Sequence, residues 1–502
     1  MEDGAHDRRI AFQLALLLAA VLALFHRGHF MSTDELGLYF QTRAIAEEGS
    51  LAVPVRVHMA FPGRDVRSYS QYVVGQSLLA APFHALGRIA TARLGMEAHR
   101  TLAGPLGMQS WLGEPMVGAG AFSVLFYPPA VVGALAALFF LFERRLGASR
   151  GAALLASCAL AGCTHAALIS TLFLQHGTEA LLALAAFFFW HRYRESGATR
   201  DVLLGSSCAA AIFNVRAAGA LNGLALGAYL AFALAERARR PDATAQLPRA
   251  LAAVALPVAG SATFYVAMNW LKWGTWLESP QLAERSTLGG DPRAALFGFL
   301  LSPGMSVFLY SPLLLLAPFT FAPFWRRHRP ECVAILALFA TTLGFYSTYA
   351  LWTGLFSCPG PRYLFTAMVF LMLPLGPWLD AARSLPARAS FVVLAAAGAG
   401  VQGLSITISW ARLLSAEGWG LWRPDFGFVF DWHAAPLFAA ARHAFEPIYW
   451  DLWLPRTALG WPGQPGKPAL ALALLAAWAA LVALLGLWLR RALASAEAQR
   501  AP

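Results

Sequence analysis

The apolar stretches of this chain constrain its fold more than any other feature, because many of them are about as long as a bilayer is thick. An α-helix rises about 1.5 Å per residue, so roughly 20 apolar residues cross a hydrocarbon core of about 30 Å. Hydrophobic residues make up 58% of the 502 residues, and charged residues only 13%. Soluble proteins carry about twice that share of charge, roughly 25%. The sequence therefore predicts an integral membrane protein and excludes a disordered chain or a water-soluble globule.

Twelve of these stretches predict membrane-spanning helices. They cover residues 10–26, 117–142, 150–171, 177–192, 201–214, 217–235, 249–270, 304–325, 331–351, 362–380, 387–411 and 469–489. The stretch at 201–214 is the weakest, because it is short. The first stretch is expected to be a retained anchor, since it lacks a small-x-small cleavage site. The expected fold class is thus an all-α polytopic membrane protein with about twelve transmembrane helices.

The arginines predict which ends of these helices face the cytoplasm. Membrane proteins concentrate short basic loops on the inside. With twelve spans and Arg8-Arg9 inside, every short basic loop is cytoplasmic: 144–150, 191–194, 237–240, 326–329, 383–388 and 490–491. Both termini are then cytoplasmic, and four loops face outward: 27–116, 271–303, 352–361 and 412–468. This topology explains many of the arginines behind the net charge of +11, so no nucleic-acid partner is expected.

The first outer loop is expected to contain interfacial helices. Residues 33–48 have a helical pattern of apolar positions, and residues 73–91 are apolar but interrupted by Gly75 and Pro82. A full span at 73–91 would invert the sidedness of every later loop, so an interfacial or re-entrant helix is expected there.

Two regions are expected along the chain. Residues 1–411 form a membrane module that includes the loop 27–116, and residues 412–502 form a Trp-rich outer loop followed by the final transmembrane helix. The five cysteines show no Cys-x-x-Cys pair and no zinc spacing, so neither a disulfide framework nor a zinc site is expected.

Asp34 and Glu35, a few residues after the first span, are the first candidates for chemistry. Adjacent carboxylates point in different directions on a helix, so one could act as a base while the other orients it or binds a cation. The alternative is a helix start, in which Ser32 or Thr33 caps the helix and acids occupy its first turn.

Arg362 and Tyr363 open a later span from the outer side, after a Pro-Gly-Pro sequence. A guanidinium at this boundary can bind a phosphate through two parallel hydrogen bonds, and a helix N-terminus adds its own positive end. The alternative is that Arg362 extends toward lipid headgroups.

Other polar residues gather at the outer ends of spans. His176 and Glu179 share one helix face and allow a metal pair, although two residues do not make a site. The stretch 302–312, with Tyr310 and Ser311, could line a cavity or simply begin a helix.

Arg216, between Asn214 and Asn222, stands among weak apolar runs. An arginine at membrane depth is usually paired or functional, but a short hairpin could instead place it at the outer surface.

Taken in order, these segments resemble the GT-C superfamily of membrane glycosyltransferases, which includes protein O-mannosyltransferases and aminoarabinose transferases. The resemblance is carried by Asp34-Glu35, by the run from Tyr69 to Gly87, and by the segments Asn269–Thr275, Ser302–Pro312 and Gly360–Leu364. It covers most of residues 10–380. The stretch 352–358, WTGLFSC, departs from it, since relatives often have a Trp-Gly-Gly run there.

The resemblance implies transfer of a sugar from a polyprenyl-phosphate-type donor to a lipid, glycan or protein acceptor on the outer face, normally with inversion. It implies Asp34 as the base with Glu35 beside it. Arg362 and Tyr363 would bind the donor phosphate. Positions expected to line the site are His176, Glu179, Asn269, Tyr310 and Ser311. No cofactor is expected, because divalent metal is used variably in the superfamily and the sequence shows no clear metal cluster.

A polytopic transporter or lipid flippase is the alternative function. Many transporters have matching halves and polar residues at mid-membrane. This chain shows no repeat of its halves, and its polar residues gather at the outer ends of spans, which favours the glycosyltransferase.

Overall fold

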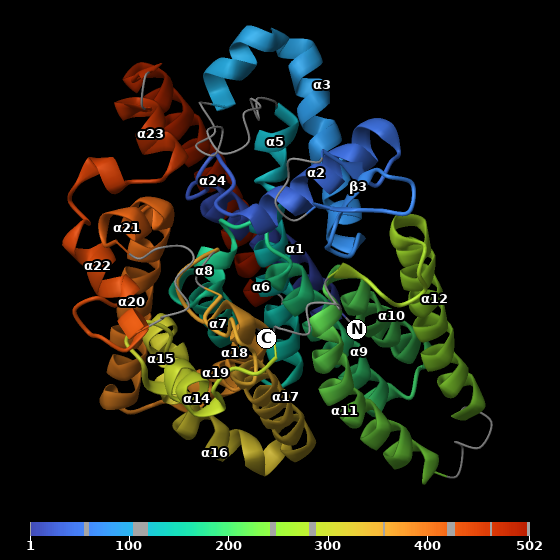
Figure 1. Cartoon of the computed structure of the whole chain (residues 1–502). Helices are drawn as coiled ribbons and strands as arrows, with labels where there is room; N and C mark the ends of the chain where they lie inside the picture. The colour runs from blue at the N-terminus through green and yellow to red at the C-terminus, as the bar shows by residue number, and fades with distance from the viewer. Residues whose placement is uncertain are drawn as a thin grey trace.

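The computed structural model describes residues 2–54, 60–103, 119–240, 247–280, 288–354, 357–418, 427–461 and 464–498. Most of these residues are helical (Figure 1). They also include a sheet of strands β1 (Ala52–Val53), β3 (Ser68–Ser70) and β2 (Ala60–Pro62), in that order, and a pair formed by β4 (Gly460–Trp461) and β5 (Gln464–Pro465). The prediction of a helical polytopic protein is thus confirmed, with short strands added. Parts of the predicted outer loops, including Trp419, lie outside the described residues.

Within the described residues, seven helical stretches are long and apolar enough, by length and composition, to cross a membrane. They are Gly120–Arg145 (from α5, Ala119–Val124, and α6, Tyr127–Arg145), Ala217–Ala238 (η1, Ala217–Gly219, and α11, Ala220–Ala238), Leu247–Trp273 (α12), Arg329–Ser347 (α17), Arg362–Ala381 (η4, Arg362–Leu364, α18, Phe365–Leu371, and α19, Leu375–Ala381), Leu385–Thr407 (α20) and Pro468–Ala496 (within α24, Pro468–Ala498). The other predicted spans coincide with α1 (Glu2–Ala23), α7 (Arg150–Cys163), α9 (His176–Ser196), α10 (Thr199–Val215) and α16 (Ala317–Arg327). The number of twelve spans remains a prediction.

Two of the interrupted spans have breaks that lie close together. The span 150–171 breaks after α7 and resumes as the short α8 (Ala166–Ile169). The span 304–325 divides into α15 (Val307–Tyr310), η3 (Pro312–Leu316) and α16, because a proline lacks the N–H that a continuous helix needs. The two breaks meet, since the N–H of His165 donates to Oγ of Ser311 at 3.0 Å. Polar backbone and side chains are thereby brought together inside the bundle.

The first outer loop contains two helices, as predicted. Helix α2 (Thr33–Glu48) coincides with its predicted range. Helix α3 (Gly75–Ala103) is longer than predicted and extends beyond the other helices at the top of Figure 1. The predicted interruption at Pro82 is wrong, because Pro82 lies inside a continuous helix. A proline removes one helical hydrogen bond without necessarily ending the helix.

The basic loops gather at one end of the bundle. Ion pairs join Arg145 to Glu195 at 2.7 Å and Arg194 to Glu331 at 2.7 Å, while the hydroxyl of Ser149 donates to Asp380 at 2.6 Å. These contacts connect the loops after α6, α9 and α19 with the start of α17. A single basic end agrees with the predicted sidedness, although which side it faces remains a prediction.

The first and last helices lie against each other. Nε of Arg150 contacts Asp7 at 2.7 Å, and its Nη1 donates to the carbonyl of Ala496 at 3.3 Å, so both chain ends lie at the basic end. Farther along, the indole N–H of Trp478 in α24 donates to the carbonyl of Ala20 in α1 at 2.7 Å.

The region predicted as a separate unit from residue 412 onward packs onto the rest of the chain. Its elements are α21 (Trp410–Ala416), η5 (Gly427–Val429), α22 (Pro436–Arg442), η6 (Pro447–Tyr449) and α23 (Trp453–Leu459). Helix α14 (Pro292–Leu301) lies earlier in the chain, before the interrupted span 304–325. The N–H of Trp453 donates to the carbonyl of His26 at 3.1 Å, which joins α23 to the end of the first helix.

Candidate active site

Asp34 lies in the first turn of α2, and a reciprocal cap sets the start of this helix. The hydroxyl oxygen of Ser32 accepts from the N–H of Glu35 at 3.4 Å, and the Glu35 carboxylate accepts from the N–H of Ser32 at 3.0 Å. Such a capping box satisfies two otherwise unpaired N–H groups. The predicted helix start is confirmed, and it presents Asp34 at the positive end of the helix.

Glu35 is fully buried, and backbone groups surround its carboxylate. Oε2 accepts from the N–H of Met31 at 2.6 Å, and Oε1 accepts from the N–H of Phe173 at 2.6 Å. Burial raises the pKa of this carboxyl group, while the N–H donors act in the opposite direction. Glu35 therefore ties the start of α2 to the segment before α9. In the described part of the chain it shares no hydrogen-bond partner with Asp34.

Asp34 meets Arg362, which is 328 positions away in the sequence. One carboxylate oxygen lies 3.3 Å from the guanidinium and accepts from the hydroxyl of Ser357 at 2.8 Å. The other accepts from the phenol of Tyr72 at 2.7 Å. Burial and the neighbouring Asp34 carboxylate raise the pKa of Tyr72 well above its ordinary value, so the phenol stays protonated as a donor. The structure thus brings together the two residues predicted as base and phosphate ligand.

Aromatic rings surround the guanidinium of Arg362. It lies 5.0 Å from the ring centre of Tyr363, which stacks on Tyr346 at 4.7 Å with nearly parallel planes. The guanidinium of Arg216 lies over the same two rings, at 5.4 and 5.5 Å. His176, a predicted lining residue, has its ring 6.0 Å from that of Tyr363.

Glu179 neutralises Arg216. The two groups are 2.8 Å apart, and the other oxygen of Glu179 accepts from the amide of Asn222 at 2.5 Å. Arg216 lies in the turn between α10 and α11, as the hairpin alternative predicted, but it is buried and paired rather than exposed at the surface. The metal pair that the spacing of His176 and Glu179 allows has no third ligand, since no group of three or more His, Cys, Asp or Glu occurs where the structure describes the chain.

Several buried polar atoms around Arg362 have no hydrogen-bond partner within the described ranges. They are Nε of Arg362, both ring nitrogens of His165 and of His176, and the hydroxyls of Tyr310, Tyr346 and Thr353. Buried polar groups are almost always paired, so a concentration of unpaired ones indicates a place for a ligand or ordered water.

Two glycines let the backbone approach these side chains. A Cβ at Gly354 would lie 2.7 Å from Nε of Arg362, and one at Gly360 would lie 2.7 Å from the ring of Tyr310 and 2.9 Å from that of His165. Both glycines have positive φ, at +59° and +87°, a conformation that other residues rarely adopt.

Asn269 lies apart from Arg362, in α12. It lines a small pocket with Asn214, Lys272 and Tyr72. The buried ammonium of Lys272 donates to the carbonyl of Tyr72 at 2.8 Å, so Tyr72 connects this pocket to Asp34.

Several residues of the site were not predicted from the sequence. Tyr72 lies within the run that carried the resemblance, and Ser357 lies in the stretch that departs from it, so both had a weak signal. His165 and Tyr346 stand inside apolar runs, where nothing in the sequence distinguishes a site residue from a core residue.

The chain is similar over much of its length to solved glycosyltransferase structures, while no protein-family model and no curated protein matches it. ArnT from Cupriavidus metallidurans in the apo state is 13% identical, with 97% of this chain and 73% of that chain covered and a TM-score of 0.47. The same protein bound to undecaprenyl phosphate is also 13% identical, with 89% of this chain and 75% of that chain covered and a TM-score of 0.46. The apo oligosaccharyltransferase of Archaeoglobus fulgidus is 12% identical, with 78% of this chain covered and a TM-score of 0.41, and this chain spans 57% of its length. At these levels likeness alone assigns no activity.

Proposed function

We propose that this chain is a membrane glycosyltransferase of the GT-C type. It moves a sugar from a polyprenyl-phosphate-type donor to an acceptor on the outer face of the membrane, with Asp34 as the base and Arg362 at the donor phosphate. One observation carries the proposal: Asp34 and Arg362, 328 positions apart, meet at 3.3 Å beside a concentration of unpaired buried polar atoms. A positioned carboxylate and a positive group at the leaving phosphate are what an inverting transfer needs.

In the proposed step, the acceptor hydroxyl oxygen attacks the anomeric carbon of the donor. The bond from that carbon to the phosphate oxygen breaks, and its electron pair leaves on the phosphate. The hydroxyl proton passes to Asp34, and the guanidinium of Arg362 stabilises the charge that develops on the leaving phosphate. Attack from the face opposite the phosphate inverts the configuration.

The contacts of Asp34 also order the binding of the two substrates. Without a ligand, its two oxygens accept from Tyr72, Ser357 and Arg362. A donor phosphate competes for the guanidinium and so leaves one oxygen of Asp34 available to the acceptor proton. Tyr72 keeps the other oxygen in place. The donor is therefore expected to bind before the acceptor.

The test is transfer by the purified full chain in liposomes. Undecaprenyl- and dolichol-phosphate sugars are the first donors to try. Undecaprenyl phosphate is bound in a structure of ArnT, and dolichol phosphate is bound in a structure of the oligosaccharyltransferase AglB from Archaeoglobus fulgidus. Release of polyprenyl phosphate would be followed with a cell-envelope extract as the acceptor. Asp34→Asn keeps the shape but removes the base, so turnover should fall about 100- to 10,000-fold while donor binding persists.

Asp65→Asn, at an exposed position of the same loop, is the matched control and should keep wild-type turnover. Full turnover in Asp34→Asn, combined with loss in Glu35→Gln, would move the base to Glu35. Full turnover in both variants would remove this loop from the chemistry.

A further inference from the structure

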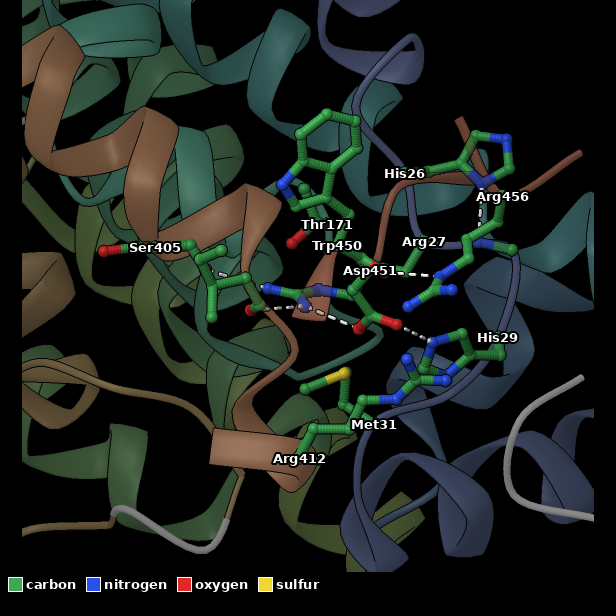
Figure 2. A network of polar contacts seen from close by, with 12 residues as sticks. His26, Arg27, His29, Met31, Thr171, Ser405, Arg412, Trp450, Asp451 and Arg456 are labelled. Carbon is green, nitrogen blue, oxygen red and sulfur yellow. Dashed lines mark hydrogen bonds and ion pairs between the residues drawn. The ribbon is translucent and has the colours of Figure 1, made fainter. Parts of the chain in front are cut away.

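A second buried polar network lies where the end of the first helix meets the C-terminal region (Figure 2). The Asp451 carboxylate contacts Nη1 of Arg27 at 2.8 Å with one oxygen and Nε2 of His29 at 2.8 Å with the other. The three residues are at most 7% exposed. Asp451 is more than 400 positions from both partners, so the contact joins distant parts of the chain.

The surroundings of His29 require both of its ring nitrogens to carry protons. Nδ1 lies 3.0 Å from the carbonyl oxygen of Phe30, and Nε2 lies 2.8 Å from the Asp451 carboxylate. Both oxygens are acceptors only, so only the imidazolium donates to both. Burial lowers the pKa of His29, but the Asp451 carboxylate outweighs it and the pKa lies above its ordinary value. Burial also opposes the charge of Asp451, yet His29 and Arg27 lower its pKa to about 2.

The network continues by hydrogen bonds to Glu35, which is next to the proposed base in the sequence. His29 contacts the carbonyl of Phe30, and the next two N–H groups, of Met31 and Ser32, donate to Glu35 in the first turn of α2. Asp34 stands in that same turn. The segment between His29 and Asp34 therefore has little freedom while Asp451 holds its start.

The C-terminal region is fitted closely to this segment. Gly28 has a φ of +78°, and a Cβ on it would lie 2.7 Å from the ring of Trp453. The N–H of Asp451 donates to the carbonyl of Thr407 at 2.7 Å, and Arg27 also donates to the carbonyl of Ser405 at 3.0 Å. The end of α20 thus supports the same junction.

We propose that Asp451 is a positioning residue for Asp34. Through Arg27 and the imidazolium of His29 it fixes the segment that begins α2, and so sets the distance between the base and Arg362. Asp451 touches no substrate, and this inference rests on the proposed function of Asp34.

A dependence on pH follows from His29. The charged groups around it are Arg27, Asp451 and Glu35, with His26 and Arg456 close by in Figure 2. A group whose pKa is raised on folding contributes fully below its ordinary pKa, about 6.5 for histidine, and loses that contribution as pH rises through the raised value. Loss of the proton removes one of the two hydrogen bonds of His29. The clamp that Asp451 forms with Arg27 and His29 is therefore expected to loosen in alkaline conditions. Asp451 stays ionised throughout.

The test combines kinetics with hydrogen exchange of residues 26–40 in the full chain between pH 6 and 9. Asp451→Asn should lower kcat about 10- to 100-fold, the cost of a slightly misplaced catalytic group, with the donor KM nearly unchanged. Hydrogen exchange in this segment should become faster. Once the intrinsic change of exchange rate with pH is subtracted, no further pH dependence should remain. Asp451→Glu should restore part of kcat, and Asp431→Asn, at an exposed position of the same region, should match the wild type.

His29→Gln is the milder second variant if Asp451→Asn does not fold, and it should abolish the same pH dependence. Wild-type kcat and wild-type exchange in a folded Asp451→Asn protein would overturn the inference. If the wild type shows no transfer but Asp451→Asn still increases exchange in α2, the glycosyltransferase proposal fails and the clamp stands.

Discussion

Arg362 combines a carboxylate partner with an unused donor. Its Nη groups contact Asp34, whereas its Nε is buried without a partner in the described part of the chain. Gly354 leaves just enough space beside that nitrogen. A guanidinium with an unpaired N–H can bind a phosphate in a fixed geometry. Contact with lipid headgroups at a bilayer surface would not require such geometry.

Substitution of Arg362 distinguishes binding of the donor phosphate from contact with lipid headgroups. Arg362→Lys keeps the charge but loses the planar fork, so partial activity is expected, whereas Arg362→Ala should lose about 100- to 1,000-fold in kcat. Both should insert normally. Turnover and donor KM with a polyprenyl-linked donor in liposomes are the measurements. Wild-type turnover from Arg362→Ala would remove this residue from the site.

Glu35 should behave differently from Asp34. Glu35→Gln turns an acceptor oxygen into an N–H₂ group that faces backbone N–H donors, and an unpaired buried donor costs about 1–3 kcal/mol of unfolding free energy. Thermal unfolding in detergent should show this loss, while turnover per folded molecule stays far above that of Asp34→Asn. Normal stability with abolished turnover would instead make Glu35 part of the chemistry.

Among the helices, α1 and α6 approach each other closely at a glycine. A Cβ on Gly133 would lie 2.5 Å from the carbonyl oxygen of Ala15. Small residues allow helix backbones to approach in this way within membranes.

Adding one methyl group there should force the two helices apart. Gly133→Ala is expected to cost about 1–3 kcal/mol, as overpacking usually does. Gly344→Ala in α17 is the control, because no atom lies within 4 Å of its Cβ position. Melting temperatures of the two variants in the same detergent make the comparison. Equal values would show that the α1–α6 contact relaxes without cost.

How well an element could be predicted depends on whether its signal is local. The range of α2 follows from its cap and its apolar pattern, both readable within 33–48. The break between α7 and α8 depends on the contact between His165 and Ser311, 146 positions apart, which hydropathy cannot register. The second half of α3 is not apolar enough to be recognised, and strands of two or three residues are too short to show alternation.

In the molecule as a whole, the candidate site was predicted as separate residues rather than as an assembly. Asp34 and Arg362 each had a chemical reason to be chosen, but nothing along the chain states that they meet. Asn269 was chosen by resemblance and lies in a separate pocket. Asp451 lies outside the resemblance, and its contacts with Arg27 and His29 appear only in the folded arrangement.

The orientation of the molecule is testable by labelling. In a background without its five cysteines, Arg64→Cys and Arg239→Cys place single thiols at exposed positions of the first outer loop and of a basic loop. A membrane-impermeant reagent applied to intact cells should label only the first, because the basic loops are expected inside. Labelling of only the second would invert the whole topology.

The contact between α1 and α24 also has a consequence for synthesis of the protein. Helix α1 leaves the ribosome long before α24 exists, so the surface of α1 that contacts α24 must wait in the lipid until α24 has been translated. Asp451 is made late as well, and the loop that bears Asp34 gains its anchor only then. A nascent chain that already contains Asp34 and Arg362 but not yet Asp451 would therefore remain without an ordered site, and the site would form only after the C-terminal region has been made.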